Sequence, residues 1–353
     1  MSKVSIVIVT LNSEETLPKT LESIKKQVFP QKDIEVLVVD GGSLDQTRAI
    51  AKRYKTKVIN NPKIQQNYAK FLGYQLARGK YLMFLDSDEA LENKNSLKKR
   101  VEVFKKYPLV KAVIGSGYKN PPNFPFINQY LSEFGDPFSF FMYRISKDAG
   151  IFVPSMRKKY KGVQETKGYL ILDLTGEVDL PLIELTAGGS MIDVDFLKWK
   201  FPEIGRRPEL INHIFYLLQS ESSLLAISKK DAVWHYSDIS FWRYLSKISW
   251  RVRVNIHYPQ SVGAGGFVGR NKLPWVGNMG FKKYLFALYA GSLVAPLVDS
   301  VSLVLTRREI RYLLHLPLCL ITFGLIVYHG ILKIMGFKPR LLSYGGKKPV
   351  KTS

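Results

Sequence analysis

The sequence of 353 residues contains a single cysteine, Cys319, which lies inside an apolar run. One cysteine excludes an intrachain disulfide and a cysteine-cluster zinc site, so we expect Cys319 to serve packing. No G-x-G-x-x-G follows the first apolar run and no G-x-x-x-x-G-K-[ST] occurs, which excludes the dinucleotide fingerprint and the P-loop. The first residues have no basic leader followed by an apolar stretch of signal-peptide length, so no export signal is expected.

Acidic residues are scarce toward the C-terminal end. Residues 229–353 hold only 4 of the 29 Asp and Glu residues but 19 of the 52 Lys and Arg residues, and the whole chain has a net charge of +23. Such an excess indicates a polyanionic partner, either nucleic acid or an anionic membrane surface. Two apolar runs, residues 285–305 and 312–332, favour the membrane, because each is long enough to cross a hydrocarbon core of roughly 30 Å. We therefore expect a lipid partner and no nucleic acid.

The two apolar runs predict a membrane hairpin over residues 284–335. Basic residues before the first run and in the tail of residues 336–353, among them Lys338 and Arg340, place the catalytic part on the cytoplasmic side. Pro296 and Asp299 interrupt the first run, so two buried helices of a soluble domain are the alternative, and Arg307, with its basic neighbours, argues against full spanning.

A third membrane signal precedes the hairpin. Residues 241–257 mix Trp and aliphatic residues with Lys and Arg at helical spacing, which predicts a basic helix lying along a lipid interface. An ordinary surface helix docked on the core is the alternative. The Gly-rich residues 263–280 predict a mobile loop between this helix and the hairpin.

The first part of the chain alternates between two kinds of segment. Apolar runs typical of buried strands are separated by stretches with helical periodicity, which is the pattern of an α/β fold with a mostly parallel, doubly wound sheet and helices on both faces. Ligands of such sheets bind outside the carboxyl ends of the strands. The predicted strands are residues 4–11, 34–39, 58–59 and 81–85, and the predicted helices are residues 14–27, 45–54 and 65–78.

Polar residues gather at the predicted strand ends. Thr10 and Asn12 follow the first strand and Asp40 follows the second. Two glycines after Asp40 let the backbone approach a ligand, and Asp45 is a suitable helix N-cap. Asp40 can accept hydrogen bonds from a base or a ribose. A tight turn with a capping Asp is the alternative, and it accounts for Gly42 and Asp45 but not for Asp40.

Asp86 and Asp88 follow the apolar run of residues 81–85. Because a strand alternates its side chains, both carboxylates can face one crevice with Ser87 turned away. Hard cations prefer such oxygen ligands together with substrate phosphates, so the pattern predicts a Mg²⁺ or Mn²⁺ site. An Asp-rich turn after a strand is the alternative.

Three segments, V-S-I-V-I-V-T-L-N, V-L-V-V-D-G-G-S-L-D-Q-T and Q-L-A-R-G-K-Y-L-M-F-L-D-S-D-E, resemble in order and spacing the family 2 glycosyltransferases of the GT-A fold. The resemblance covers residues 1–110 and implies a pocket for a UDP- or GDP-sugar. It implies that Thr10, Asn12 and Asp40 hold the nucleoside, that Asp86 touches the ribose or the metal, and that Asp88 ligates Mg²⁺ or Mn²⁺.

Two positions depart from the family pattern. Leu11 stands where an aromatic residue commonly stacks near the base, and Lys70 with Phe71 stands where Arg-Asn is common. The contacts to the base and the diphosphate are therefore expected to differ, with Lys70 as the candidate ligand of the donor.

Further candidate site residues follow from the same resemblance. Residues 185–191 look like the family's glycine loop, in which Gly188 and Gly189 leave room for the acceptor and the sugar. Glu209 stands where the family places its general base, although a Glu in the first turn after Pro208 also complements the helix dipole. His235 matches a histidine that approaches the metal or diphosphate in many relatives, and a satisfied structural histidine is the alternative. Guanidinium groups suit phosphate oxygens, so the diphosphate ligands include Arg206 and Arg207.

The sequence thus predicts a catalytic domain over residues 1–235, of which 1–110 bind the nucleotide sugar and 111–235 the acceptor, then an interfacial helix and loop (236–283), a hairpin (284–335) and a basic tail (336–353). With the hairpin, the chain is similar to polyprenyl- and dolichyl-phosphate sugar transferases. The predicted function is metal-dependent, inverting transfer of a sugar to a membrane lipid acceptor. The alternatives are transfer to a hydroxyl of a soluble glycan, and a basic nucleic-acid or membrane binding scaffold without activity.

Overall fold

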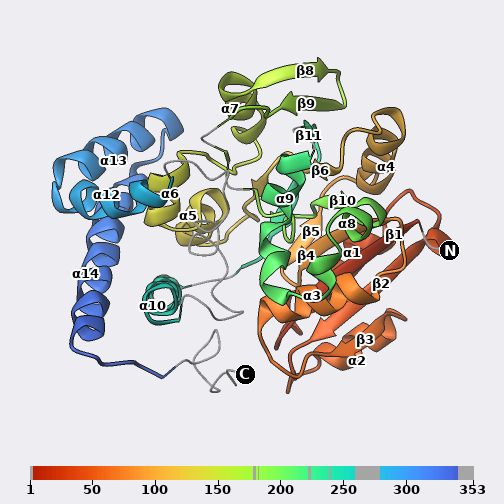
Figure 1. The fold of residues 1–353 in the computed structure, drawn as a ribbon, viewed down its shortest axis with the longest axis horizontal. Coiled ribbons are helices and arrows are strands. Elements are labelled where there is room, and N and C mark those ends of the chain that lie inside the picture. Colours follow the sequence, from red (N-terminus) through yellow and green to blue (C-terminus); the bar gives the residue numbers. More distant parts are fainter. Residues whose placement is uncertain are drawn as a thin grey trace.

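A computed structural model describes residues 3–177, 180–181, 183–221, 224–237, 240–258 and 279–340. Its first part has the predicted alternation of strands and helices, and the α/β class is confirmed (Figure 1). The apolar runs form strands whose side chains are buried on both faces, as expected for a sheet covered by helices. These elements are β1 (Val4–Thr10), α1 (Leu17–Lys25), η1 (Gln31–Asp33), β2 (Ile34–Asp40), α2 (Thr47–Arg53), β3 (Lys57–Asn60), α3 (Gln66–Leu76), β4 (Tyr81–Asp86), β5 (Glu89–Leu91) and α4 (Ser96–Lys106).

The second part of the catalytic region completes the sheet and adds short helices beside it (Figure 1). It consists of β6 (Ala112–Ile114), β7 (Tyr118–Lys119), α5 (Phe126–Phe134), α6 (Pro137–Tyr143), α7 (Phe152–Lys159), β8 (Lys161–Glu165), β9 (Tyr169–Asp173), β10 (Met191–Asp193), α8 (Val194–Lys200), η2 (Pro202–Gly205), η3 (Pro208–His213), α9 (Ile214–Glu221), β11 (Leu224–Ser228) and β12 (Val233–His235).

The main sheet has nine strands in the order β3-β2-β1-β4-β10-β6-β11-β9-β8. Strands β3, β2, β1 and β4 are parallel, but β10 pairs antiparallel with β4 and β6, and β9 pairs antiparallel with β11 and β8. The expectation of a mostly parallel sheet is therefore correct for the half that β1–β4 form and wrong for the other half, which makes the sheet mixed. A second sheet, β5-β12-β7, lies at the end of β4 and brings residue 235 next to residue 89.

The C-terminal helices stand apart from the main sheet, with α5 and α6 between them (Figure 1). They are α10 (Phe241–His257), α12 (Met279–Gly291), α13 (Val294–Arg307), η4 (Ile310–Leu314) and α14 (His315–Ile334). Helix α10 has the bounds that the sequence predicted. The Gly-rich stretch after it, up to residue 278, lies outside the described residues, as does the basic tail beyond Arg340, with Lys347, Lys348 and Lys351.

Only one described helix is straight, long and apolar enough to cross a membrane, residues Ile310–Ile334. The other predicted span is divided into α12 and α13, which meet at an angle of 85° around Ser292 and Leu293. Leu293 has a positive φ of 59°, which no regular helix contains. The prediction of two spanning helices is corrected accordingly: the first run is a bent pair, which counts as a span only if both halves are taken together.

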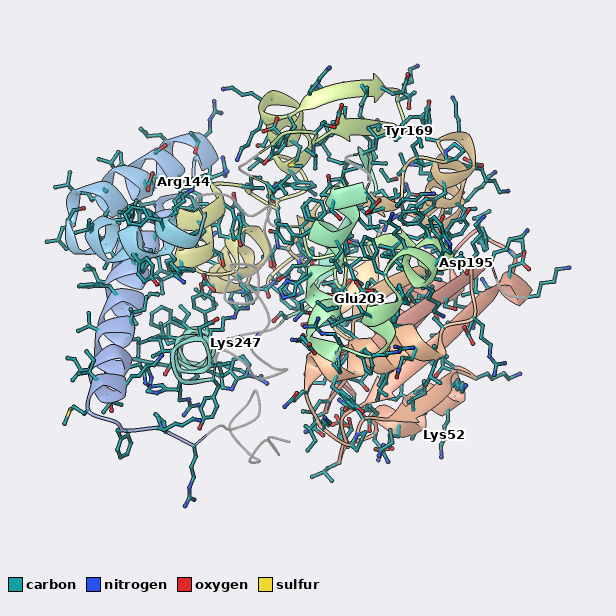
Figure 2. All side chains as sticks on the ribbon, in the orientation of Figure 1. Lys52, Arg144, Tyr169, Asp195, Glu203 and Lys247 are labelled. Carbon is teal, nitrogen blue, oxygen red and sulfur yellow. The ribbon has the colours of Figure 1, made fainter. Side chains whose placement is uncertain are left out.

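Charged residues that interrupt the apolar runs pair with the catalytic region. Arg144, after α6, donates to Asp299 of α13 at 2.6 Å, and Arg307 at the end of α13 donates to Glu133 of α5 at 2.9 Å. Arg144 lies beside the C-terminal helices in Figure 2. These pairs explain why Asp299 and Arg307 occur in otherwise apolar sequence: their partners lie on the protein and not in lipid.

Candidate active site

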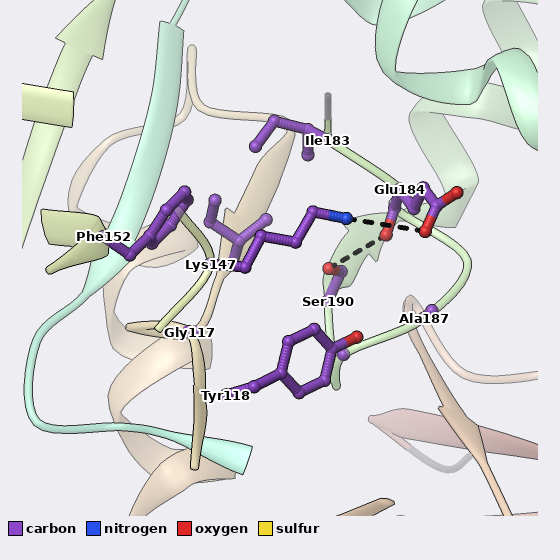
Figure 3. A pocket seen from close by; sticks show the side chains of 11 residues that line it. Gly117, Tyr118, Lys147, Phe152, Ile183, Glu184, Ala187 and Ser190 are labelled. Atoms are coloured by element: carbon purple, nitrogen blue, oxygen red, sulfur yellow. Dashed lines mark hydrogen bonds and ion pairs between the residues drawn. The ribbon is translucent and has the colours of Figure 1, made fainter. Parts of the chain in front are cut away.

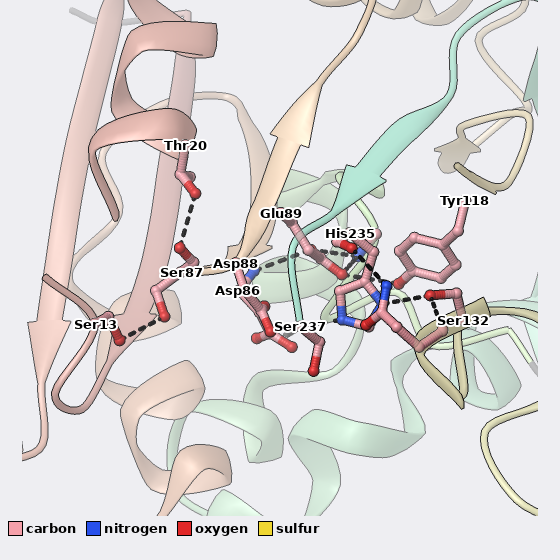
Figure 4. A network of polar contacts seen from close by, with 12 residues as sticks. Ser13, Thr20, Asp86, Ser87, Asp88, Glu89, Tyr118, Ser132, His235 and Ser237 are labelled. Carbon is pink, nitrogen blue, oxygen red and sulfur yellow. Dashed lines mark hydrogen bonds and ion pairs between the residues drawn. The ribbon is translucent and has the colours of Figure 1, made fainter. Parts of the chain in front are cut away.

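The D-x-D segment turns at the carboxyl end of β4, and Ser87 points away from its two neighbours (Figure 4). The Ser87 hydroxyl lies 2.8 Å from that of Ser13, and its carbonyl accepts a hydrogen bond from the Thr20 hydroxyl at 2.9 Å. Ser87 is therefore anchored to the β1–α1 side. Asp86 and Asp88 lie on the other side, as strand alternation predicts.

His235 joins Asp88 at this site. Its Nε2 atom lies 3.6 Å from Asp88 Oδ2, and the N–H of Tyr236 donates to the Asp88 carbonyl at 2.7 Å, so β12 holds the histidine against the D-x-D turn. Burial lowers the pKa of His235, but the neighbouring Asp88 carboxylate outweighs it and the net pKa is raised. Burial likewise raises the pKa of Asp88, and His235 reverses that into a net lowering. The two groups favour each other's charged forms.

Glu89 is a buried site residue that the sequence analysis did not select. Its carboxylate accepts hydrogen bonds from the N–H of Asp86 at 2.9 Å, from the N–H of Gly188 at 2.9 Å and from the Tyr118 hydroxyl at 2.8 Å (Figure 4). Burial and the Asp86 carboxylate raise the pKa of Glu89 to about 7. The signal was available, since Glu89 directly follows the D-x-D, but its partners come from distant segments.

Two lysines approach the same carboxylates. Lys70 of α3 is buried and its Nζ lies 3.3 Å from Asp86 Oδ1, while Gln66 donates to the same oxygen at 3.0 Å. Lys247 of α10 faces the catalytic region (Figure 2), where burial lowers its pKa to about 8 although Asp88 acts in the opposite direction. The sequence predicted Lys247 as part of a lipid-facing basic helix, whereas the structure turns it toward Asp88.

Thr10, Asn12 and Asp40 form a second polar group at the ends of β1 and β2. Asp40 is fully buried and accepts hydrogen bonds from the Thr10 hydroxyl at 3.2 Å and the Gly42 N–H at 3.1 Å, with Ser43 and Arg48 as further donors. Asn12 accepts from the Leu44 N–H at 2.9 Å. Asp40 thus has a structural task that the sequence did not reveal, because its side chain fixes the loop after β2.

The glycine loop lies between the D-x-D turn and a pocket. Gly188 has φ of +64°, and a Cβ there would fall 2.9 Å from the Tyr118 hydroxyl, so a side chain would displace the tyrosine. The buried Arg100 donates to the Gly189 carbonyl and pairs with Asp231 at 2.9 Å. Figure 3 shows the pocket beside this loop. It is lined by Ile114, Gly115, Gly117, Tyr118, Lys147, Phe152, Ile183, Glu184, Ala187, Gly188 and Ser190, and an ion pair of 3.7 Å joins Lys147 to Glu184.

Arg206, Arg207 and Glu209 lie in the segment of η2 and η3, which packs against α3. Arg207 donates to Glu209 at 2.8 Å. Burial raises the pKa of Glu209, but this hydrogen bond and the charge of Arg207 lower it overall. No hydrogen bond or ion pair in the described part of the chain joins these residues to Asp86 or Asp88, so their roles stay predictions.

The donors at the D-x-D turn suit a hard cation. Carboxylates of Asp86 and Asp88 offer oxygen ligands, and His235 offers an imidazole nitrogen, a set that fits Mn²⁺ or Mg²⁺. Among the described residues no group of three or more His, Cys, Asp and Glu side chains forms a ready-made metal cage.

Part of the chain is similar to known glycosyltransferases. Residues 5–158 match the model described as Glycosyl transferase family 2. The chain is 36% identical over 106 residues to poly(ribitol-phosphate) beta-N-acetylglucosaminyltransferase TarS of Staphylococcus aureus, which covers 28% of this chain and 18% of that protein. It is 35% identical over 91 residues to glycosyltransferase AglE of Haloferax volcanii, covering 24% of this chain and 30% of that protein.

A crystal structure of S. aureus TarS 1-349 in complex with UDP-GlcNAc aligns with 96% of this chain and 93% of its own, at 16% identity and a TM-score of 0.47. The sequence alignments with eight such relatives each cover at most 39% of the relative's own length. The match covers residues 5–158, less than half of the chain, and includes the D-x-D at the end of β4, so this part of the chain is similar to a family 2 glycosyltransferase domain, as the sequence predicted.

Proposed function

We propose that the chain is a metal-dependent, inverting glycosyltransferase that moves a sugar from a nucleotide-diphosphate sugar to an acceptor held by a membrane lipid. The observation that supports this most strongly is the convergence of Asp86, Asp88 and His235 at the carboxyl end of β4. That is the edge of an α/β sheet at which ligands bind.

The donor would lie along this edge. Thr10, Asn12 and Asp40 would face its nucleoside, with the Asp40 loop already fixed by its own hydrogen bonds, so that it loses little conformational freedom on binding. Lys70 would face the diphosphate. The pocket beside Gly188 and Tyr118 adjoins the carboxylate network and offers hydroxyl-binding groups in Lys147 and Glu184, so it suits a sugar ring.

The leaving nucleoside diphosphate gains negative charge as the anomeric bond breaks. When bound, Mg²⁺ or Mn²⁺ would neutralise that charge, and Asp86, Asp88 and His235 are the residues that would hold it. Lys70 and Lys247 add positive charge on either side of the carboxylates. In the inverting reaction the acceptor oxygen attacks the anomeric carbon opposite the departing diphosphate.

The C-terminal helices favour an acceptor in the membrane. Their outer faces leave large apolar side chains exposed, including Leu288 at 71% and Leu305 at 72%. Large apolar side chains exposed on neighbouring helices are typical of contact with lipid. Helix α10 adds Trp242, which is 75% exposed beside basic residues, as expected at a lipid interface.

Glu209 bears on the chemical nature of the acceptor. A hydroxyl acceptor needs a base, but the pairing of Glu209 with Arg207 lowers its pKa and makes it a weak one. A phosphate monoester, with a second pKa of roughly 6, is already charged at neutral pH and needs no strong base. This favours polyprenyl phosphate over a sugar hydroxyl.

A lipid-linked or soluble glycan is the second candidate acceptor. The relative TarS is named for transfer to poly(ribitol phosphate), a polymer with free hydroxyl groups. For such an acceptor Glu209 would have to leave Arg207 and take the proton of the attacking hydroxyl.

The proposal is tested by incubating the detergent-solubilised full chain with Mn²⁺ and a panel of UDP- and GDP-sugars, together with polyprenyl phosphate, with a polyol polymer as the glycan acceptor, or with neither. We expect one donor to be consumed and its sugar to appear on the polyprenyl phosphate. Transfer only to a glycan would replace the lipid phosphate by the second candidate, and no consumption of any donor with any acceptor would refute the activity.

A further inference from the structure

Helix α5 (Phe126–Phe134) contacts both the candidate active site and the C-terminal helices. It is short and lies between the two parts of the molecule (Figure 1). The segment around it, residues 119–184, has no chemical signature in the sequence. Its function therefore has to be inferred from its contacts.

One set of α5 residues holds His235. The Ser132 hydroxyl lies 2.9 Å from His235 Nδ1, and the Asn128 amide donates to the His235 carbonyl at 3.1 Å. Both Asn128 and Ser132 are buried. The opposite ring nitrogen of His235 faces Asp88, so α5 fixes the ring from the side away from the D-x-D turn (Figure 4).

The next residue along the helix, Glu133, holds the C-terminal helices. Its side chain is 1% exposed, and Oε1 accepts from Arg307 Nε at 2.9 Å and from the Ser146 hydroxyl at 2.7 Å. Oε2 accepts from the Tyr312 hydroxyl of η4. Three partners around a buried carboxylate leave it little freedom, because breaking its ion pair with Arg307 exposes an uncompensated charge.

The Glu133 backbone extends the same connection. Its carbonyl accepts from the Lys147 N–H at 2.9 Å, and the Lys147 carbonyl accepts from the Tyr118 N–H at 2.7 Å. Tyr118 lies against the His235 ring, with centroids 5.3 Å apart, and donates its hydroxyl to Glu89. Two contiguous paths therefore lead from Glu133 to the residues around Asp88.

We propose that Glu133, anchored by Arg307, is a positioning residue that sets the place of His235 beside Asp88, so that the C-terminal helices complete the active site as well as contact the membrane. The effect of the His235 position on catalysis rests on the proposed function. Whether the Glu133–Arg307 pair fixes His235 is a question of geometry and does not depend on that function.

A second ion pair provides a matched control. Arg144–Asp299, at 2.6 Å, also joins the catalytic region to α13, but Arg144 follows α6 and not α5. Glu133→Gln and Asp299→Asn each convert one carboxylate into the isosteric amide at the same boundary. If the pairs act only by docking the helices, the two variants should behave alike.

The experiment uses the full chain in detergent with its five histidines isotopically labelled, and the His235 imidazole signals are assigned by their loss in His235→Gln. We expect Glu133→Gln and Arg307→Ala to shift those signals and to lower kcat for donor turnover by about 10-fold, with KM for the donor little changed. Asp299→Asn should leave both the signals and kcat unchanged. Arg307→Lys, which keeps the charge, should restore most of the loss.

Two results would overturn the proposal: unshifted His235 signals in Arg307→Ala and Glu133→Gln, or equal shifts in Asp299→Asn. Thermal unfolding of each variant shows whether it is folded, and Arg307→Ala provides the same test should Glu133→Gln not fold. If the unmodified chain turned over no donor, the proposed function would fail while the imidazole signals still decided the positioning role.

Discussion

His235 Nε2 lies 3.6 Å from Asp88 Oδ2, although the two residues are far apart in the chain. The contact exists because β12 pairs with β5, the short strand that directly follows the D-x-D turn. A histidine late in the chain is thereby placed beside a carboxylate from the turn after β4. The predictions below test what this arrangement does and how the rest of the chain supports it.

Asp88→Asn should lower kcat for sugar transfer by about 100-fold or more, because it removes the carboxylate that would hold the cation against the leaving diphosphate. The volume and the backbone hydrogen bond from Tyr236 to the Asp88 carbonyl are preserved, so folding should be little affected. The measurement is steady-state transfer by the solubilised chain at saturating Mn²⁺.

Asp195→Asn is the matched control, since Asp195, labelled in Figure 2, is exposed on α8. Helix α8 begins beside Lys80 at the amino end of β4, and the D-x-D lies at the other end. It should retain the unmodified rate. Full activity of Asp88→Asn would remove the metal hypothesis for this site.

The residues that the sequence revealed are those whose signal is local. Asp86 and Asp88 follow an apolar strand directly, and Asp40 ends another, so strand ends alone predicted them. Glu89 directly follows the D-x-D, but the contacts that bury it come from distant segments. Ser132 and Glu133 have no local signal at all, because their partners are contributed by segments far along the chain. The bend at Leu293 was missed for a related reason: hydropathy records that a run is apolar, and a break in backbone direction leaves it unchanged.

Asp40 should make stability depend on pH in a defined direction. Burial raises its pKa, but hydrogen bonds from Ser43 and Arg48 lower it below the ordinary value. A carboxyl with a lower pKa in the folded chain contributes stability above its unfolded pKa of about 3.9, and this contribution is lost as pH falls through the folded pKa.

Asp40→Asn should therefore reduce the free energy of unfolding by about 1–3 kcal/mol at pH 7, and the difference from the unmodified chain should shrink below about pH 4. Thermal unfolding in detergent between pH 7 and pH 3 measures this difference. Asp195→Asn should show no such trend, and a constant deficit of Asp40→Asn across the range would contradict the assignment.

The apolar outer face of the C-terminal helices should bind lipid. Replacing Leu288 and Leu305 by Gln should weaken flotation of the chain with vesicles, since each leucine buried in lipid contributes about 1.5–3 kcal/mol. The unfolding temperature in detergent should change little, because both side chains are exposed in the fold. Leu318→Ala should affect stability and not flotation. This side chain is fully buried, so the variant should lose about 2–5 kcal/mol of stability. Unchanged flotation of the double variant would refute lipid contact by this face.

The Arg100–Asp231 pair should be among the most costly to break. Both side chains are completely buried, and Arg100 also holds the Gly189 carbonyl of the glycine loop. Asp231→Asn should lower the free energy of unfolding by about 3–5 kcal/mol, because it leaves the guanidinium uncompensated. Glu22→Gln, which removes the exposed pair with Lys26, should cost less than about 1 kcal/mol. Equal effects of the two variants in denaturant titration would show that the buried pair has no special role.

Glu209 decides between the two classes of acceptor. If the acceptor is a hydroxyl, Glu209 must take its proton, and Glu209→Gln should lower kcat by about 100-fold or more. If it is a lipid phosphate, no proton has to be removed at neutral pH, and kcat of the same variant should stay within about 3-fold of the unmodified chain.

Arg207→Gln sharpens the comparison, because it releases Glu209 from the partner that lowers its pKa. Loss of Arg207 should then speed transfer to a hydroxyl acceptor at neutral pH, where Glu209 is deprotonated in both chains and the more basic carboxylate takes the proton more readily. If Arg207 itself binds the diphosphate, KM for the donor rises with either acceptor. Measuring kcat and KM of both variants on polyprenyl phosphate and on a polyol polymer separates these cases, since only a hydroxyl acceptor makes the rate depend on the basicity of Glu209.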